Sequence, residues 1–200
     1  MARQGKTMTP KCYSINIPLP QIPEELIPEP TELQWKSMDG HNFDLLVDGE
    51  RKVGSTYTRY EPGQALKDWV RDCIHPDITT VGLQIVQGTD IFQCHTDTNF
   101  RRYIINYLVH SGGANATTVF YQEHGFPAEQ DVKKYINDYS TIDVIDSVIV
   151  PEKTWFAING QVLHGVTNLE SPRVAVSLGI PNSELYNSII AKYNILGDLT

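Results

Sequence analysis

Residues 173–180 read RVAVSLGI, an alternating and strongly apolar run that predicts a buried β-strand. Similar short runs, punctuated by Gly, Asn and Pro, occur at 81–86, 91–94, 103–109, 117–122, 148–150, 154–158 and 162–167. Because no helices alternate with these runs, the pattern favours an antiparallel sandwich or jelly roll over a parallel sheet. We therefore predict a mainly β fold with flanking helices, whose open mouth can hold a ligand.

Helical spacing of apolar residues predicts two amphipathic helices, at 62–74 and 183–193, and a third, shorter helix at 128–139. Residues 17–31 contain five prolines, which fix φ and lack a backbone donor. That segment is expected to be extended. The length of 200 residues suits one domain, so we predict a single domain over 1–200 with a Pro-rich N-terminal arm at 1–35.

The net charge of −8 makes broad attachment to a polyphosphate chain improbable, and nucleic acid is a poor candidate partner. The adjacent basic pair Arg101-Arg102 is interpreted as a solvated face. Three widely spaced cysteines without a C-x-x-C motif indicate neither a disulfide framework nor a zinc ribbon and fit a reducing cytoplasm. The sequence has no stretch typical of a signal peptide or a membrane span, so we expect a cytoplasmic protein without a membrane partner.

His95 and Asp97 lie two residues apart at the end of a predicted strand, which places both side chains on one face if the strand continues. A third ligand must come from elsewhere, and His164 lies on another short strand after a turn signal. Two imidazoles and one carboxylate on one face of an octahedral Fe(II) leave three positions for a co-substrate and oxygen. By itself, an H-x-D pair more often marks a surface turn than a metal site.

Arg173 strengthens the metal hypothesis because it begins an otherwise apolar strand. An unpaired buried guanidinium is costly, whereas a carboxylate can meet its fork with two hydrogen bonds. Ser177 is four residues further along and faces the same side, where its hydroxyl can bind the same carboxylate. A dicarboxylate ligand satisfies this demand, and the alternative is an internal salt bridge to a protein Asp or Glu.

Together, H-x-D, a distal His and an Arg nine residues later are similar to the 2-oxoglutarate/Fe(II)-dependent oxygenase family over roughly residues 80–180. The run 102–108, RYIINYL, resembles a strand of the prolyl-hydroxylase-like branch of that family, in which a Tyr before Leu binds the co-substrate carboxylate. By that resemblance Tyr107 takes this role. Gly112-Gly113 followed by Thr118 and Phe120 resembles a G-G-x-T-x-F hairpin of the same branch, with three additional residues.

The resemblance implies a double-stranded β-helix, or cupin-like jelly roll. It also implies Fe(II) held by His95, Asp97 and His164. In the family, O2 oxidatively decarboxylates 2-oxoglutarate to succinate and CO2, and hydroxylation of a second substrate is the usual outcome. The far carboxylate of 2-oxoglutarate is expected at Arg173, Ser177 and Tyr107, and Gln84 is the first choice for a further polar contact.

Two family branches are disfavoured by particular residues. Halogenating members lack the carboxylate that Asp97 supplies. The nucleic-acid demethylase branch has an R-x-N-x-x-x-x-x-R pattern, which the residues after Arg173 do not follow.

The leading hypothesis is thus a 2-oxoglutarate-dependent dioxygenase that hydroxylates a small molecule or a peptide side chain. The alternative is a noncatalytic cupin-like module that binds another metal or ligand. Fold and iron site are shared across many substrates, and we expect specificity to lie in loops such as 36–60, 97–102 and 122–146. The substrate and the oligomeric state do not follow from the sequence.

Overall fold

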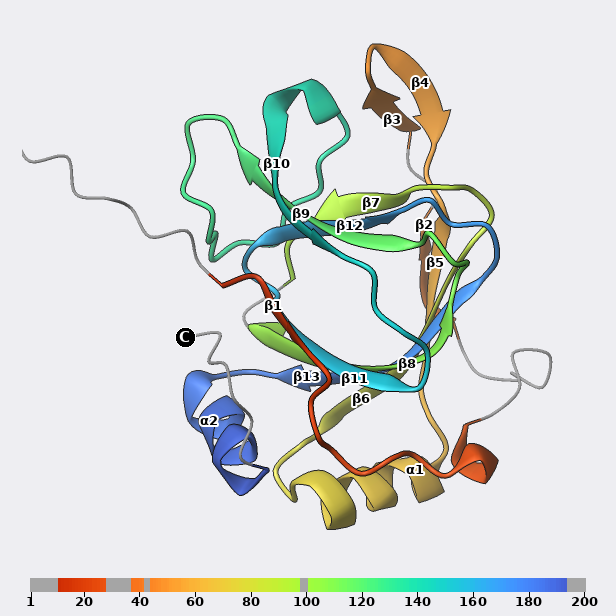
Figure 1. Ribbon diagram of the computed structural model, residues 1–200, viewed down its shortest axis with the longest axis vertical. Helices are drawn as coiled ribbons and strands as arrows, with labels where there is room; N and C mark the ends of the chain where they lie inside the picture. The colour runs from red at the N-terminus through yellow and green to blue at the C-terminus, as the bar shows by residue number, and fades with distance from the viewer. Residues whose placement is uncertain (1–10, 28–36, 42–43, 98–100, 194–200) are drawn as a thin grey trace, which may run out of the picture.

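The computed structural model describes residues 11–27, 37–41, 44–97 and 101–193, and its strands form two facing antiparallel sheets (Figure 1). The larger sheet has the order β1-β11-β8-β13-β6-β5-β2. Its strands are β1 (Tyr13–Ile15), β11 (Thr154–Asn159), β8 (Tyr103–Ser111), β13 (Arg173–Ile180), β6 (Thr80–Gln87), β5 (Thr56–Tyr60) and β2 (Ser37–His41). The prediction of a mainly β jelly roll is confirmed.

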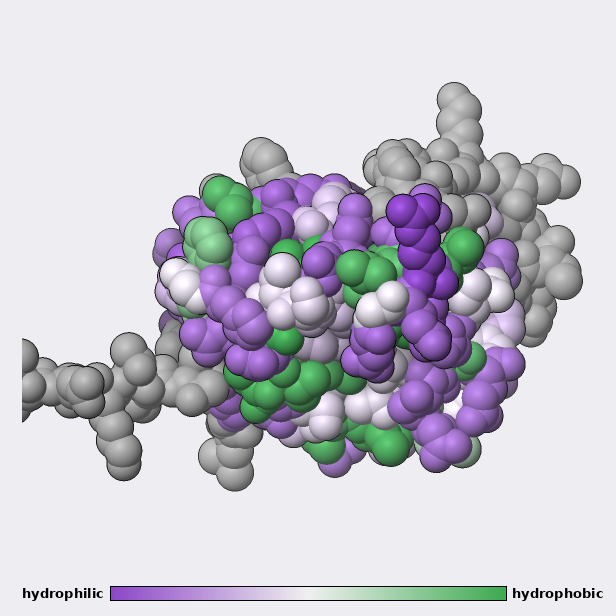
Figure 2. All heavy atoms as spheres, turned by 90° about the horizontal axis from the view of Figure 1, so that it is seen from above, coloured by the Kyte–Doolittle hydropathy of each residue, from purple (hydrophilic) through white to green (hydrophobic). Residues whose placement is uncertain are grey.

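The smaller sheet has the order β10-β9-β12-β7 and lies above the larger one in Figure 1. Its strands are β10 (Ile142–Val148), β9 (Thr117–Glu123), β12 (Leu163–Thr167) and β7 (Phe92–His95). A separate hairpin pairs β3 (Asp44–Val47) with β4 (Glu50–Val53). Figure 2 looks from above and shows a mainly hydrophilic face with smaller hydrophobic groups between the polar residues.

Strand alternation divides the larger sheet into two faces. On β13, Val174, Val176 and Leu178 pack into the largest core cluster, which also contains residues of both helices and of the N-terminal segment. The intervening residues of the same strand, Arg173 and Ala175, line a cavity between the two sheets. This alternation decides which side chains reach the cavity.

Both amphipathic helices are present and lie against the outer face of the larger sheet (Figure 1). Helix α1 (Gln64–Trp69) continues into a π-helical turn, Val70–Ile74. Helix α2 (Ser183–Lys192) begins after Asn182, whose side chain accepts a hydrogen bond of 2.9 Å from the Leu185 N–H. Among the described residues, no helix has the length and hydrophobicity needed to cross a membrane.

The N-terminal segment begins with β1 and continues along the outer face of the larger sheet. It buries Ile17, Leu19 and Ile22 in the largest core cluster and then forms a short 3-10 helix, Glu24–Leu26. The rest of the predicted arm, residues 1–10 and 28–35, lies outside the described residues. The assignment of one domain to residues 1–200 stays a prediction.

The predicted helix at 128–139 is wrong. The backbone of this segment instead bonds to β7 and to the turn between β11 and β12. The N–H of Gln130 donates to Gln161 O at 2.8 Å, and the N–H of Ile136 donates to Cys94 O at 2.9 Å. Of its apolar residues, Ile136 is buried, whereas Val132 and Tyr135 are exposed. A 3-10 turn follows at Tyr139–Thr141. The strand predicted at 148–150 begins earlier, as β10.

The region 36–60, predicted to be a specificity loop, is also different. Its described residues form β2 to β5, and β5 joins the larger sheet beside β6. As a result, residues of this region form part of the cavity wall.

Candidate metal centre and its cavity

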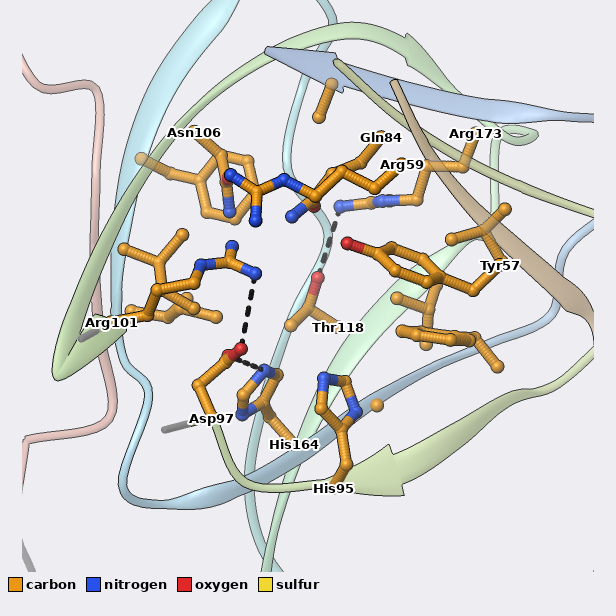
Figure 3. A pocket seen from close by; sticks show the side chains of 18 of the residues that line it. Tyr57, Arg59, Gln84, His95, Asp97, Arg101, Asn106, Thr118, His164 and Arg173 are labelled. Atoms are coloured by element: carbon orange, nitrogen blue, oxygen red, sulfur yellow. Dashed lines mark hydrogen bonds and ion pairs between the residues drawn. The ribbon is translucent and has the colours of Figure 1, made fainter. Parts of the chain in front are cut away.

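The smaller sheet brings His95, Asp97 and His164 together (Figure 3). His95 ends β7 and lies opposite His164 of β12 in the strand register. Asp97 follows β7, where its backbone N–H donates to Gly160 O at 2.8 Å. One ligand atom from each of the three side chains lies within 4.8 Å of the others.

Two glycines permit this convergence. A Cβ on Gly160 would lie 2.4 Å from the carbonyl oxygen of Arg101, and a Cβ on Gly165 would lie 2.8 Å from that of Phe92. A side chain at either position would therefore push away backbone on which the three candidate ligands depend.

The backbone also orients both imidazoles. His95 Nδ1 lies 3.0 Å from the carbonyl oxygen of Gln93, and His164 Nδ1 lies 2.8 Å from that of Val162. Since a carbonyl oxygen only accepts, each Nδ1 carries the proton and each Nε2 keeps its lone pair for a metal ion. Burial, followed by the nearby His164, lowers the pKa of His95 to about 4, so its imidazole is neutral at physiological pH.

Asp97 is held by two partners. Its Oδ1 lies 3.3 Å from Arg101 Nη1, and its Oδ2 lies 3.4 Å from His164 Nε2. Burial alone would raise the pKa of Asp97, but the positive charge of Arg101 outweighs it and holds the pKa well below its usual range. The carboxylate is therefore ionised and available as a ligand.

The donor set fits a divalent metal. Ligands bound at ~2.1 Å on adjacent octahedral positions lie ~3 Å apart, close to the 3.4 Å between Asp97 Oδ2 and His164 Nε2. Two imidazoles and one carboxylate form the facial arrangement that non-haem Fe(II) prefers. The three residues can thus hold such an ion and leave its cavity side open.

The cavity between the sheets measures ≈ 230 Å³ and contains the three candidate ligands at one end. Arg173 extends into it from β13. Its Nη1 donates to Ser111 O at 2.9 Å and its Nη2 donates to Thr118 Oγ1 at 3.2 Å (Figure 3). The side chain is 6% exposed, and within the part of the chain that the structure describes it has no carboxylate partner. Burial lowers the pKa of its guanidinium to about 10.

Gln84 also lines the cavity, as expected, because it faces inward on β6 opposite Ala175 of β13. Ser177 faces the same side as Arg173, but its hydroxyl accepts a hydrogen bond of 2.8 Å from Arg101 Nη2. Its interaction partner is therefore Arg101 rather than a ligand shared with Arg173, which corrects the role predicted for it.

Tyr107 is not brought to the cavity. It points to the outer face of the larger sheet, packs against Trp155 with ring centroids 5.1 Å apart and donates to Gln21 Oε1 at 2.7 Å. Its neighbour Asn106 faces inward instead, in register with Ser177. Strand alternation thus contradicts the role that position alone suggested for Tyr107.

Besides Asn106, the sequence reasoning missed four other residues that line the cavity. Thr118 lies beside Arg173, and Arg101 pairs with Asp97 instead of facing solvent. Tyr57 and Arg59 reach the cavity from β5. Thr117 and Thr118 are adjacent in a predicted strand, so one of the two had to face inward, and this could have pointed to Thr118. The sequence analysis did not predict β5 as a strand, so it gave no signal for Tyr57 or Arg59.

No family model matches the chain, and no curated protein matches it. Among solved structures, a 2OG-Fe(II) oxygenase-family oxidoreductase from Burkholderia pseudomallei is 8% identical, with a TM-score of 0.42, and the match covers 70% of this chain and 72% of that one. The Escherichia coli ribosomal oxygenase YcfD is 14% identical, with a TM-score of 0.44 and coverage of 83% and 48%.

A cupin-like protein from Thermotoga maritima is 12% identical, with a TM-score of 0.26 and coverage of 76% and 79%. The chain thus spans about half the length of YcfD and most of the length of the other two. At these identities and TM-scores, the activities of these proteins are not transferred to this chain.

Proposed function

We propose that this chain is an Fe(II)- and 2-oxoglutarate-dependent dioxygenase that hydroxylates a small molecule or a peptide side chain and releases succinate and CO2. One observation carries the proposal: a two-histidine, one-carboxylate cluster shares a cavity with Arg173, a buried arginine that lacks a carboxylate among its described contacts. A dicarboxylate that chelates the metal supplies ligands for its open coordination positions at one end and a carboxylate partner for Arg173 at the other.

Each residue of the metal end has a distinct task. His95 and His164 offer Nε2 because their Nδ1 protons are bound to backbone carbonyls, and Asp97 offers Oδ2. Arg101 keeps Asp97 ionised and fixes the orientation of its carboxylate. When bound there, Fe(II) supplies the activation of O2 and a chelation site for the keto-acid end of 2-oxoglutarate.

At the other end, Arg173 and Thr118 receive the far carboxylate. The guanidinium already donates to Ser111 O and Thr118 Oγ1, so its position is fixed before a ligand arrives. A carboxylate there neutralises the buried guanidinium of Arg173, whose charged form burial disfavours. Gln84 remains for a further polar contact with the ligand.

We also propose a cytoplasmic location. The three cysteines, all within the described residues, form no disulfide, which is consistent with a reducing compartment.

Anaerobic titration with Fe(II) and 2-oxoglutarate tests the proposal. The expected result is the weak visible charge-transfer band of the chelate, followed by succinate formation when O2 is admitted. His95→Ala is expected to abolish both. His124→Ala is the matched control, because His124 is exposed and pairs with the exposed Asp143. Folded wild-type protein that shows no band at saturating 2-oxoglutarate would overturn the proposal in favour of a noncatalytic cupin-like module.

A further inference from the structure

The cavity contains more positive charge than the proposed co-substrate requires. Its lining includes four cationic side chains, Arg59, Arg101, Lys133 and Arg173, and Asp97 is the one carboxylate among the described lining residues. The charges of Fe(II) and the 2-oxoglutarate dianion cancel each other. An excess of positive charge therefore persists in the loaded cavity of a chain whose overall net charge is −8.

Arg59 is the clearest unexplained member of this set. It extends from β5 over Gly82 of β6, and a Cβ on Gly82 would lie 2.4 Å from Arg59 Nε. The glycine thus provides the space in which the guanidinium lies. Within the described part of the chain Arg59 has no hydrogen bond or ion pair, and its buried Nε has no acceptor.

Arg59 and Arg101 meet over the same part of the larger sheet. Ser177 is paired in register with Gly82 on one side and with Asn106 on the other. Arg101 donates to Ser177, while Arg59 lies over Gly82. Figure 3 shows both guanidinium groups beside Asn106 and separate from the guanidinium of Arg173, which lies beside Thr118.

The polar atoms of this region are not satisfied by described residues. Arg59 Nε and Arg101 Nε are buried donors without an acceptor. Asn106 Oδ1 is also buried without a partner, but it is an acceptor, so the Nδ2 group of Asn106 is the one that can donate to an anion. Burial and the positive charge of Arg101 lower the pKa of Arg59. Two neighbouring guanidinium groups that repel each other and retain undonated N–H groups form a site for an anion.

We propose that Arg59, Arg101 and Asn106 form a second anion site, which binds an oxyanion group of the prime substrate, and that this substrate is a small molecule. This inference rests on the proposed function and selects the small-molecule alternative within it. Asn106 is buried and the Arg101 side chain is 13% exposed, so a ligand must enter the cavity to reach them, which favours a small molecule. Planar guanidinium groups bind carboxylates and phosphates alike, so the shared chemistry is a carboxylate or phosphate group.

The test uses the arginine Nε–H cross-peaks of the ¹⁵N-labelled full chain, assigned with Arg59→Gln and Arg173→Gln. Zn(II) and the unreactive co-substrate analogue N-oxalylglycine occupy the first site, and the complex is titrated with acetate or with methyl phosphate. The Arg59 cross-peak is expected to shift saturably with at least one probe. Whichever probe binds more tightly identifies the substrate group.

Two variants displace or remove the Arg59 guanidinium. Arg59→Gln and Gly82→Ala are each expected to weaken probe binding about tenfold, which corresponds to one lost charge-assisted interaction. Binding to both variants is read from the Nε–H cross-peak of Arg101, because Arg59→Gln lacks that of Arg59. Gly82 has ordinary strand geometry and its added Cβ meets a flexible side chain, so this variant keeps the charge and moves it. Arg51→Gln, on the exposed face of β4, removes one positive charge elsewhere and is expected to leave probe binding unchanged.

Probe affinity that stays within twofold of wild type in both Arg59→Gln and Gly82→Ala would overturn the inference. So would binding that only Arg173→Gln abolishes. Failure of the proposed function has a different signature: Zn(II) and N-oxalylglycine fail to bind, while the same titration of the protein alone still shows saturable binding at Arg59.

Discussion

The two ends of the cavity differ in how their charges are balanced. At the metal end, Asp97 and Arg101 neutralise each other, and Ser177 holds Arg101 in place. At the other end, Arg173 is more deeply buried than Asp97 or Arg101, but its described partners are a carbonyl oxygen and a hydroxyl. The charge of Arg101 thus has a carboxylate partner, whereas the charge of Arg173 has none among its described contacts.

This difference separates two kinds of buried charge. Removing one partner of a buried ion pair leaves the other charge buried without compensation and destabilises the fold. A buried charge without a partner itself lowers stability, and we infer that it is retained to bind a ligand. Substituting the arginine at each end of the cavity should therefore change the free energy of unfolding by different amounts and in opposite directions.

The largest effect is expected from removing a metal ligand. Asp97→Ala deletes the one carboxylate of the cluster and leaves Arg101 without its acid partner. We expect metal affinity to fall at least ~100-fold, because loss of even an outer contact costs 10–100-fold. Titration with Fe(II) under anaerobic conditions measures this, with the exposed Asp143→Ala as control. Equal affinities of the two variants would remove Asp97 from the metal site.

Stability in the absence of metal should distinguish the two arginines. Arg101→Met leaves Asp97 buried without its cation and is expected to lower the free energy of unfolding by about 3 kcal/mol. Arg173→Met removes a buried charge that has no acid partner and is expected to raise it by about 1 kcal/mol. Urea denaturation measures both. A loss of stability in Arg173→Met equal to that in Arg101→Met would show that Arg173 has a structural anion.

The pH dependence of stability should report His95. Burial lowers its pKa in the folded state to about 4, whereas the unfolded chain has the ordinary value of ~6.5. The unfolded state therefore binds more protons between these values, and stability is lost as the pH falls below about 6.5. Since His95 is partly exposed, we expect a loss of ~1–2 kcal/mol by pH 5.

Thermal unfolding of the metal-free protein at pH 7 and pH 5 measures this loss, and His95→Gln should show a smaller one. An identical pH dependence in both proteins would contradict the assigned direction of the shift.

The smallest effect is expected at Thr118. Thr118→Val removes the hydroxyl that accepts from Arg173 Nη2 and should weaken 2-oxoglutarate binding about fivefold, as expected for a contribution of ~1 kcal/mol. Metal affinity should stay unchanged. Thr117→Val is the matched control, because the Thr117 hydroxyl bonds to the carbonyl oxygen of Asn115 on the exposed side. A weakened metal site in Thr118→Val would show that the two ends of the cavity are not independent.

Much of the fold followed from local pattern. The runs at 103–109 and 173–180 carry enough apolar, alternating residues to be recognised as strands, and both form central strands of the larger sheet. The spacing of His95 and Asp97 indicated a shared side, and the structure brings both beside His164. By contrast, the apolar residues of 128–139 satisfied a helical pattern, while the backbone partners of this segment lie on β7 and in the turn between β11 and β12.

The roles of individual side chains around Arg173 were less predictable. Tyr107 and Asn106 are neighbours on one strand, so their side chains face opposite sides of the sheet, and Asn106 is the one that faces the cavity. Arg59 lies on a strand with an irregular hydrophobic pattern, and its place in the cavity depends on pairing with β6. Such pairings join residues far apart in the chain, so no local pattern contains them.

By itself, the sequence determined the strand-rich class of the fold, the residue types of the candidate metal cluster and the presence of an arginine that needs an anion. These depend on composition and short spacings, which local physical chemistry constrains directly. The tertiary structure decided that Arg101 neutralises Asp97, that Thr118 rather than Tyr107 accompanies Arg173, and that Arg59 enters the same cavity. The physical reason is that strand register and the facing of two sheets bring together side chains from distant segments.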